Sequence, residues 1–170
     1  MPISHLNVSG YRSIRSIYLR LERINVLTGP NGCGKSNLYR SLYLITMAAQ
    51  GQFAKTIADE GGMPSVLWAG ARTKGPVRVS VGVTLDLLAY ELSCGLTPAE
   101  QNPTNPFLLD PYIKEENVWL LSGKQRQSML ERASGSAMLR DSEGNRTKFP
   151  MTFQKQNLYY RSLKSRTVLL

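Results

Sequence analysis

A glycine-rich stretch, "GPNGCGKS", occupies residues 29–36 and fits the spacing G-x-x-x-x-G-K-[ST]. Glycines let the backbone bend so that successive N–H groups point at phosphate oxygens, and the positive end of a following helix dipole faces the same anion. The ammonium of Lys35 can reach the β- and γ-phosphates, and the hydroxyl of Ser36 can ligate Mg²⁺. The pattern predicts a site for ATP and Mg²⁺.

The predicted contacts extend one residue beyond the pattern. The candidate ATP-binding residues are Gly29, Pro30, Asn31, Gly32, Cys33, Gly34, Lys35, Ser36 and Asn37. Cys33 could also act as a redox thiol, because a helix N-terminus lowers the pKa of a thiol, but a small residue filling the loop is the preferred interpretation. His5 is the single histidine, which argues against a histidine-based metal site or catalytic triad.

The flanks of the loop have the order that phosphate binding requires. The apolar run "INVL", residues 24–27, predicts a buried strand that ends at Thr28. Residues 35–50 have the spacing of an amphipathic helix. The side chains expected on its apolar face are Leu38, Leu42, Ile45 and Ala49.

Alternating polar and apolar residues predict strands through most of the remaining chain. The N-terminal strands are expected within residues 4–8 and 16–21, and two further strands within residues 77–96. Short strands follow at residues 117–121, 128–132 and 137–141, with a turn at "DSEGNR". Residues 97–111, "TPAEQNPTNPFLLDP", are rich in Pro and Asn and predict a loop.

We therefore expect an α/β fold: the N-terminal lobe of a P-loop NTPase with an antiparallel β subdomain. The P-loop lobe is expected to occupy residues 1–76 and the antiparallel lobe residues 77–150. Residues 151–170 are expected to be an aberrant basic tail without stable order. The sheet of such a lobe would be incomplete.

Composition is compatible with one domain: the chain has 170 residues, of which 42% are hydrophobic. No apolar run is long enough to span a membrane and no signal peptide is visible, so a cytoplasmic protein is expected.

The net charge of the chain is +9. The basic residues Lys155, Arg161, Lys164 and Arg166 supply part of it. A solvated basic surface is the preferred interpretation, and DNA binding stays open as the alternative.

Residues 6–45, "LNVSGYRSIRSIYLRLERINVLTGPNGCGKSNLYRSLYLI", resemble the N-terminus of RecF/SMC-like ATPases of the ABC class. Residues 61–83, 108–120 and 129–146 resemble one bacterial branch of predicted AAA-type ATPases within that class. The resemblance implies a head that binds ATP between itself and a second head, in a homodimer. It also implies that Arg12, in an aromatic-Arg-Ser turn, approaches the nucleotide, although a surface arginine at the end of a strand is an equal alternative.

Two motifs that such an ATPase needs for hydrolysis have only imperfect counterparts. "FLLDP", residues 107–111, lacks a glutamate after the aspartate and is bracketed by prolines, which do not suit a central strand. "LLSGKQRQ", residues 120–127, resembles the ABC signature, but Lys124 replaces a glycine, so a loop between strands is preferred. This chain alone is therefore expected to bind ATP without hydrolysing it.

The resemblance stops after Pro150. Codons compatible with residues 156–170 can be read in a shifted frame to give "ESVLSQLKEPHRF", a continuation that fits the resembling proteins. We therefore expect a frameshifted tail from about residue 153, on a truncated product; a genuine divergent C-terminus is the alternative. Two other functions stay open: a nucleotide-dependent interaction module completed by a partner chain, and a DNA-binding module of a repair or defence system.

Overall fold

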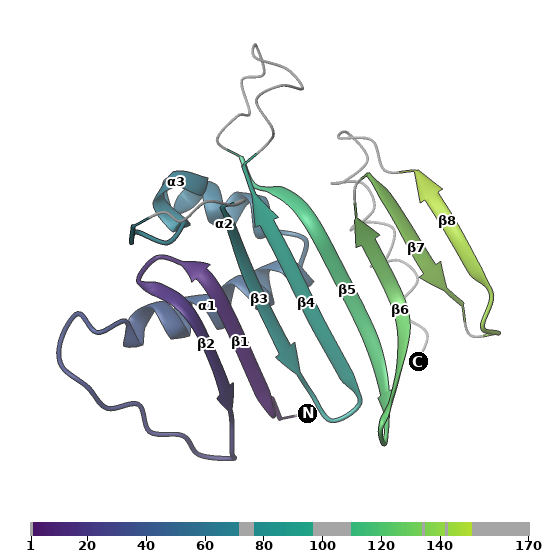
Figure 1. Cartoon of the computed structure of the whole chain (residues 1–170), viewed down its shortest axis with the longest axis horizontal. Helices are drawn as coiled ribbons and strands as arrows, with labels where there is room; N and C mark the ends of the chain where they lie inside the picture. Colours follow the sequence, from purple (N-terminus) through teal and green to yellow (C-terminus); the bar gives the residue numbers. More distant parts are fainter. Residues whose placement is uncertain (1, 72–76, 97–109, 134, 142, 151–170) are drawn as a thin grey trace, which may run out of the picture.

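Eight strands form one antiparallel sheet in the order β2-β1-β3-β4-β5-β6-β7-β8 (Figure 1). This computed structural model describes residues 2–71, 77–96, 110–133, 135–141 and 143–150. The strands are β1 (His5–Tyr11), β2 (Ile14–Arg20), β3 (Arg78–Thr84), β4 (Leu88–Gly95), β5 (Tyr112–Ser122), β6 (Gln125–Ala133), β7 (Ser136–Arg140) and β8 (Arg146–Pro150).

Alternation in the sequence explains which strand face is buried. In β3, Val79, Val81 and Val83 are buried, and Leu6 and Val8 of β1 face the same core. Successive side chains of a strand point to opposite faces, so this alternation fixes the register of the sheet. The strands predicted within residues 4–21 and from residue 77 onward, and the turn after β7, are confirmed.

Three helices cover one face of the sheet beside β1, β3 and β4 (Figure 1). They are α1 (Lys35–Ala49), α2 (Phe53–Asp59) and α3 (Met63–Val66). The predicted helix after the loop is confirmed, but its predicted face is partly wrong: Ala49 is exposed, whereas Ser41 is fully buried. The Ser41 hydroxyl donates to the carbonyl oxygen of Leu38 at 2.6 Å, which lets a polar residue face the core.

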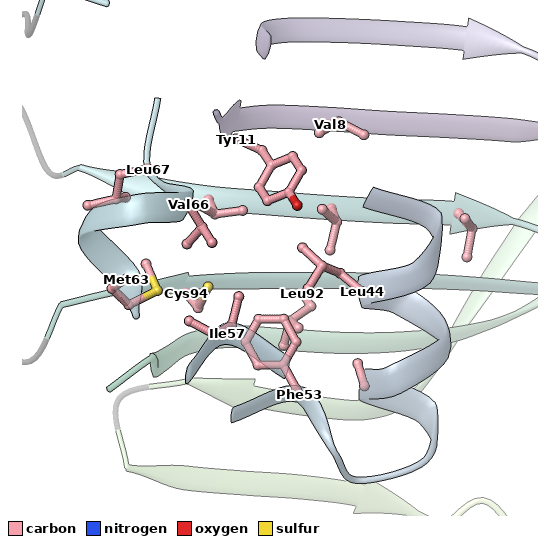
Figure 2. Close-up of a cluster of buried hydrophobic side chains, with 14 of the residues drawn as sticks. Val8, Tyr11, Leu44, Phe53, Ile57, Met63, Val66, Leu67, Leu92 and Cys94 are labelled. Atoms are coloured by element: carbon pink, nitrogen blue, oxygen red, sulfur yellow. The ribbon is translucent and has the colours of Figure 1, made fainter. Parts of the chain in front are cut away.

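The main core lies between the helices and the sheet (Figure 2). Tyr11 from β1 packs there with Leu44 from α1 and Ile57 from α2, and all three are 0% exposed. Met63 and Val66 of α3 complete this end of the core. Packing of Tyr11 therefore fixes the end of β1, and with it the start of the turn that contains Arg12.

The predicted buried strand at residues 24–27 is wrong. The segment between β2 and α1 contains no strand, and Ile24 and Val26 are 85% and 80% exposed. A strand needs a hydrogen-bonding neighbour, and no described strand lies beside this segment. An apolar run forms a buried strand only when another strand pairs with it, and the described residues contain no strand paired with this segment.

The described strand pairs are all antiparallel, so a parallel α/β sheet is not seen among these residues. The antiparallel part of the expected fold is present. β1 pairs with β3, so strands from both expected lobes, residues 1–76 and 77–150, share one sheet. Of the loop expected at residues 97–111, residues 97–109 lie outside the described residues, as does the tail expected at residues 151–170. None of the described helices is long and apolar enough to cross a membrane.

Candidate functional site

The glycine-rich loop leads directly into helix α1. Gly34 is the N-cap residue, and its φ of 101° lies in the left-handed region that favours glycine. A Cβ atom at this position would lie 2.9 Å from the Ser13 hydroxyl oxygen. Gly32 has a φ of 80°, so the backbone turns sharply on both sides of Cys33. These glycines are required by the conformation of the loop.

Backbone N–H groups at the start of α1 are available to an anion. Asn37 and Leu38 donate to the carbonyl oxygen of Gly34 at 3.0 and 3.2 Å. Within the part of the chain that the structure describes, the N–H groups of Gly34, Lys35 and Ser36 have no protein acceptor, and α1 has no side-chain cap. Free N–H groups at a helix N-terminus, together with the helix dipole, form an anion site.

Lys35 is folded back onto the loop. Its Nζ atom donates to the carbonyl oxygens of Gly29 and Pro30 at 2.6 and 2.8 Å, and lies 3.7 Å from the Cys33 sulfur. The ammonium is therefore held by carbonyl oxygens of the loop that the spacing predicts for phosphate. A phosphate group entering the loop would replace these carbonyl contacts with a charge-assisted hydrogen bond.

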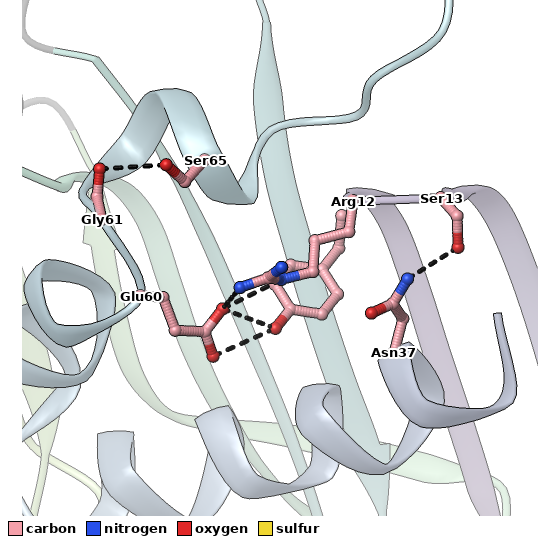
Figure 3. A network of polar contacts seen from close by, with 7 residues as sticks. Arg12, Ser13, Asn37, Glu60, Gly61 and Ser65 are labelled. Carbon is pink, nitrogen blue, oxygen red and sulfur yellow. Dashed lines mark hydrogen bonds and ion pairs between the residues drawn. The ribbon is translucent and has the colours of Figure 1, made fainter. Parts of the chain in front are cut away.

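The other predicted loop residues lie around this lysine. Asn31, Gly32, Cys33 and Ser36 are exposed, so their groups face solvent at the mouth of the loop. Asn37 is different: its Nδ2 donates to the Ser13 hydroxyl oxygen at 2.7 Å (Figure 3). The first turn of α1 is thus tied to the turn between β1 and β2.

Arg12, the remaining predicted site residue, lies in that β1–β2 turn. It has a φ of 50°, uncommon for a residue with a side chain. Its N–H donates to the Val66 carbonyl oxygen at 2.8 Å, and its carbonyl accepts from the Ala69 N–H at 2.9 Å. The surrounding backbone therefore imposes the unusual conformation, a situation that recurs at functional sites.

The Arg12 guanidinium is bound to Glu60, the residue after α2 (Figure 3). Nη2 and Nε lie 2.6 and 3.0 Å from the Oε2 atom of Glu60. The Tyr11 hydroxyl donates to the same carboxylate, at 3.0 Å to Oε2 and 3.2 Å to Oε1. In Figure 3 the Arg12 side chain points toward Glu60 and away from Asn37. The structure thus brings Arg12 next to the loop by its backbone only.

Burial and charge set the protonation of this network. Burial, followed by the negative charge of Glu60, raises the pKa of Tyr11 to about 12, so the phenol stays neutral and donates. Burial alone would lower the pKa of Arg12, but its hydrogen bonds with Glu60 and Tyr11 raise it, so the guanidinium stays charged. The cluster is a neutral phenol, a cation and a carboxylate at one edge of the core.

Sequence reasoning missed Glu60 and Ser13. Glu60 lies 48 residues from Arg12 in the chain, and no local pattern links the two. Ser13 belongs to the aromatic-Arg-Ser turn, which was singled out in the sequence. Its contact with Asn37, however, joins residues 24 apart in the chain, and no local pattern indicates it. Both contacts depend on how α1 and α2 pack on the sheet.

The two imperfect hydrolysis motifs differ in outcome. Residues 120–127 comprise the end of β5, a turn at residues 123–124 with Gly123 at a φ of 58°, and the start of β6, so the interpretation as a loop between strands is confirmed. Residues 107–109 lie outside the described part. Among the described residues, no cluster of three or more His, Cys, Asp or Glu side chains could hold a metal ion.

Comparison with known proteins adds two findings. A family model described as "AAA domain, putative AbiEii toxin, Type IV TA system" matches residues 24–146, which include the loop, all three helices and strands β3 to β7. The chain is also 33% identical over 82 residues to the chromosome partition protein Smc of Myxococcus xanthus (strain DK1622). That alignment covers 47% of this chain and 6% of the Smc protein.

Proposed function

We propose, because the chain belongs to the AAA-domain family whose model it matches, that residues 29–37 bind ATP with Mg²⁺. The family match and the similarity to Smc also bear out the resemblance to SMC-like ATPases. The described residues would form one lobe of a P-loop head. The chain's match spans a small share of the Smc protein, so the activity of a whole SMC-like protein is a proposal for this chain.

The free N–H groups of Gly34, Lys35 and Ser36 carry this proposal. They lie at the positive end of α1, and the ammonium of Lys35, the first residue of that helix, donates to the Gly29 carbonyl oxygen of the same loop. A triphosphate is the ligand whose charge and oxygen atoms match several N–H donors and one ammonium. The exposed Ser36 hydroxyl would hold Mg²⁺, which bridges phosphate oxygens in such sites.

A binding titration with a fluorescent ATP analogue, with and without Mg²⁺, tests this function. Lys35→Ala removes a charged contact worth about 1.5–3 kcal/mol, so we expect the affinity to fall about 10- to 100-fold. Ser36→Ala should remove most of the dependence on Mg²⁺. Lys124→Ala, an equal charge change at the exposed β5–β6 turn, is the matched control. Binding that survives Lys35→Ala unchanged would refute the proposed site.

We also propose that the ATP-bound form associates with a second head. Four large apolar side chains on and before α1 are exposed: Ile24, Val26, Tyr39 and Tyr43. Tyr39 and Tyr43 are four residues apart and therefore lie on one side of the helix. Exposed apolar groups of this size favour a protein contact. Light scattering with and without Mg-ATP tests it, and an unchanged monomer mass would count against it.

Hydrolysis would then require groups from outside the described residues. We propose that an Asp-Glu strand and a signature motif must be supplied by another segment or another chain. The alternative function, a nucleotide-dependent interaction module, shares the same exposed apolar groups. Restoration of ATPase activity by a partner chain, and its loss with Lys35→Ala, would support completion in trans.

A further inference from the structure

Two cationic side chains belong to the proposed ATP site or to the turn that contacts it, and each is already bound to oxygen atoms of the protein. Lys35 donates to the carbonyl oxygens of Gly29 and Pro30, which are neutral acceptors. Arg12 donates to the Glu60 carboxylate, a charged acceptor. The two cations therefore differ in how strongly the protein holds them. A phosphate displaces neutral carbonyls readily, whereas a carboxylate competes with it for the guanidinium.

The β1–β2 turn that carries Arg12 contacts the start of α1. The next residue, Ser13, accepts a hydrogen bond from Asn37 at 2.7 Å, and the Ser13 hydroxyl is also close to Gly34. Hydrogen bonds to Val66 and Ala69 fix the backbone of Arg12, and they hold the turn in place against the end of α3 and the segment that follows it. A long arginine side chain on this fixed turn can point either toward Glu60 or toward the N-terminus of α1.

Burial makes the contact with Glu60 stronger than an ordinary surface ion pair. The Arg12 and Glu60 side chains are 24% and 15% exposed, in contrast to the surface pair Arg20–Glu22 at 78% and 74%. Charges that are partly removed from water attract each other more strongly. Arginine also binds carboxylate and phosphate with the same planar array of N–H groups. A nucleotide phosphate and the Glu60 carboxylate can therefore compete for the same N–H groups of Arg12.

We propose that Glu60 is a positioning residue that competes with the phosphates of bound ATP for Arg12. Without nucleotide, Glu60 holds the guanidinium away from the loop. With nucleotide, the guanidinium exchanges the carboxylate for a phosphate oxygen, and Glu60 keeps its hydrogen bond from Tyr11. This inference rests on the proposed function, because it requires a phosphate at residues 29–37.

The competition makes a prediction that a purely structural role for Glu60 does not make. Glu60→Gln keeps an oxygen acceptor for Tyr11 but removes the charge that holds Arg12. We expect it to tighten binding of Mg-ATP about 3- to 10-fold, because Arg12 is released. A structural contact would instead give an unchanged or weaker affinity. Glu131→Gln, which makes the same charge change at an exposed carboxylate paired with Arg146, should have no effect.

The test is a cycle of ATP-binding titrations on wild type, Glu60→Gln, Arg12→Ala and the double variant. The tightening caused by Glu60→Gln should largely disappear when Arg12 is alanine. Glu60→Asp keeps the charge and shortens the side chain, so it should also tighten binding through a looser contact with Arg12. It separates release of Arg12 from the general effect of removing a negative charge, and replaces Glu60→Gln if that variant does not fold.

The outcomes distinguish failure of the competition from failure of the proposed function. If wild type binds ATP through Lys35 and both Glu60 variants bind equally or more weakly, the competition is refuted while the proposed function stands. If tightening persists in the Arg12→Ala background, Glu60 acts through its charge alone and the competition is again refuted. If Lys35→Ala leaves binding unchanged, the proposed function fails. If neither wild type nor any variant binds ATP, the proposed function and the competition are both refuted.

Discussion

Asn37 and Ser13 are joined by a hydrogen bond of 2.7 Å, so the first turn of α1 is fastened to the β1–β2 turn. Through this contact the glycine-rich loop is held against the sheet as well as by its own helix. The bond also places Ser13 against Gly34, the N-cap residue. The loop conformation therefore depends on a residue that does not belong to the loop motif.

Removing this bond should loosen the loop. Ser13→Ala deletes the acceptor, and we expect the unfolding free energy to fall by about 1 kcal/mol and ATP affinity to fall by up to about 10-fold. Ser16→Ala, an exposed serine on β2, is the matched control and should change neither quantity. Chemical denaturation and ATP titration measure the two effects. Equal behaviour of the two variants would show that the bond does not support the loop.

Gly10 is required by a close approach of β1 to β3. It has a φ of 70°, and a Cβ there would overlap the Arg78 carbonyl oxygen. Gly10→Ala should therefore cost about 2–4 kcal/mol from the left-handed conformation and the overlap together. Gly123→Ala has a similar φ of 58° but no atom within 4 Å, so about 1 kcal/mol is expected. Equal losses in the two denaturation curves would contradict the close approach.

Tyr11 should make stability fall at high pH. Burial raises its pKa to about 12 in the folded chain, above the ordinary tyrosine value of 10.0. Unfolded chains therefore lose this proton first, so the stability from Tyr11 is complete below pH 10 and is lost as the pH rises toward about 12. Tyr11→Phe should be less stable at pH 8, because Glu60 loses a donor, and less sensitive between pH 9 and 11. Parallel pH profiles would refute this linkage.

Ile24 and Val26 should contribute little to the stability of this chain. Both are largely exposed, so replacing each with serine should change the unfolding free energy by less than about 0.5 kcal/mol. Leu44→Ala, at 0% exposure, should cost about 2–5 kcal/mol and serves as the comparison. The serine variants should also weaken any association seen with Mg-ATP. A large loss of stability would show that the segment is packed, as its hydropathy suggested.

Much of the fold was predictable because strands and helices leave periodic patterns. The alternation in residues 77–96 gave β3 and β4, and the glycine spacing placed the start of α1 at Lys35. Local patterns failed where burial depends on distant partners. Residues 24–27 look like a buried strand but have no neighbour among the described strands, and Ser41 is buried although it is polar.

The site shows the same division between local and distant information. Residues 29–37 could be proposed from spacing alone, because each glycine, lysine and serine has a local role. The partner of Arg12 could not, because Glu60 reaches it only after α2 has packed against the core. No local sequence pattern indicates that the Arg12 guanidinium is paired with a carboxylate.

Hydrogen exchange of the loop amides, with and without Mg-ATP, tests the central claim most directly. If phosphates bind the free N–H groups of Gly34, Lys35 and Ser36, exchange in residues 29–37 should slow by more than about 10-fold when ATP is added. Residues 125–133 of β6 should be unaffected, and the protection in Lys35→Ala should be weaker than in wild type at the same ATP concentration. Unchanged exchange in the loop, at ATP concentrations that saturate binding, would contradict the proposed ATP site.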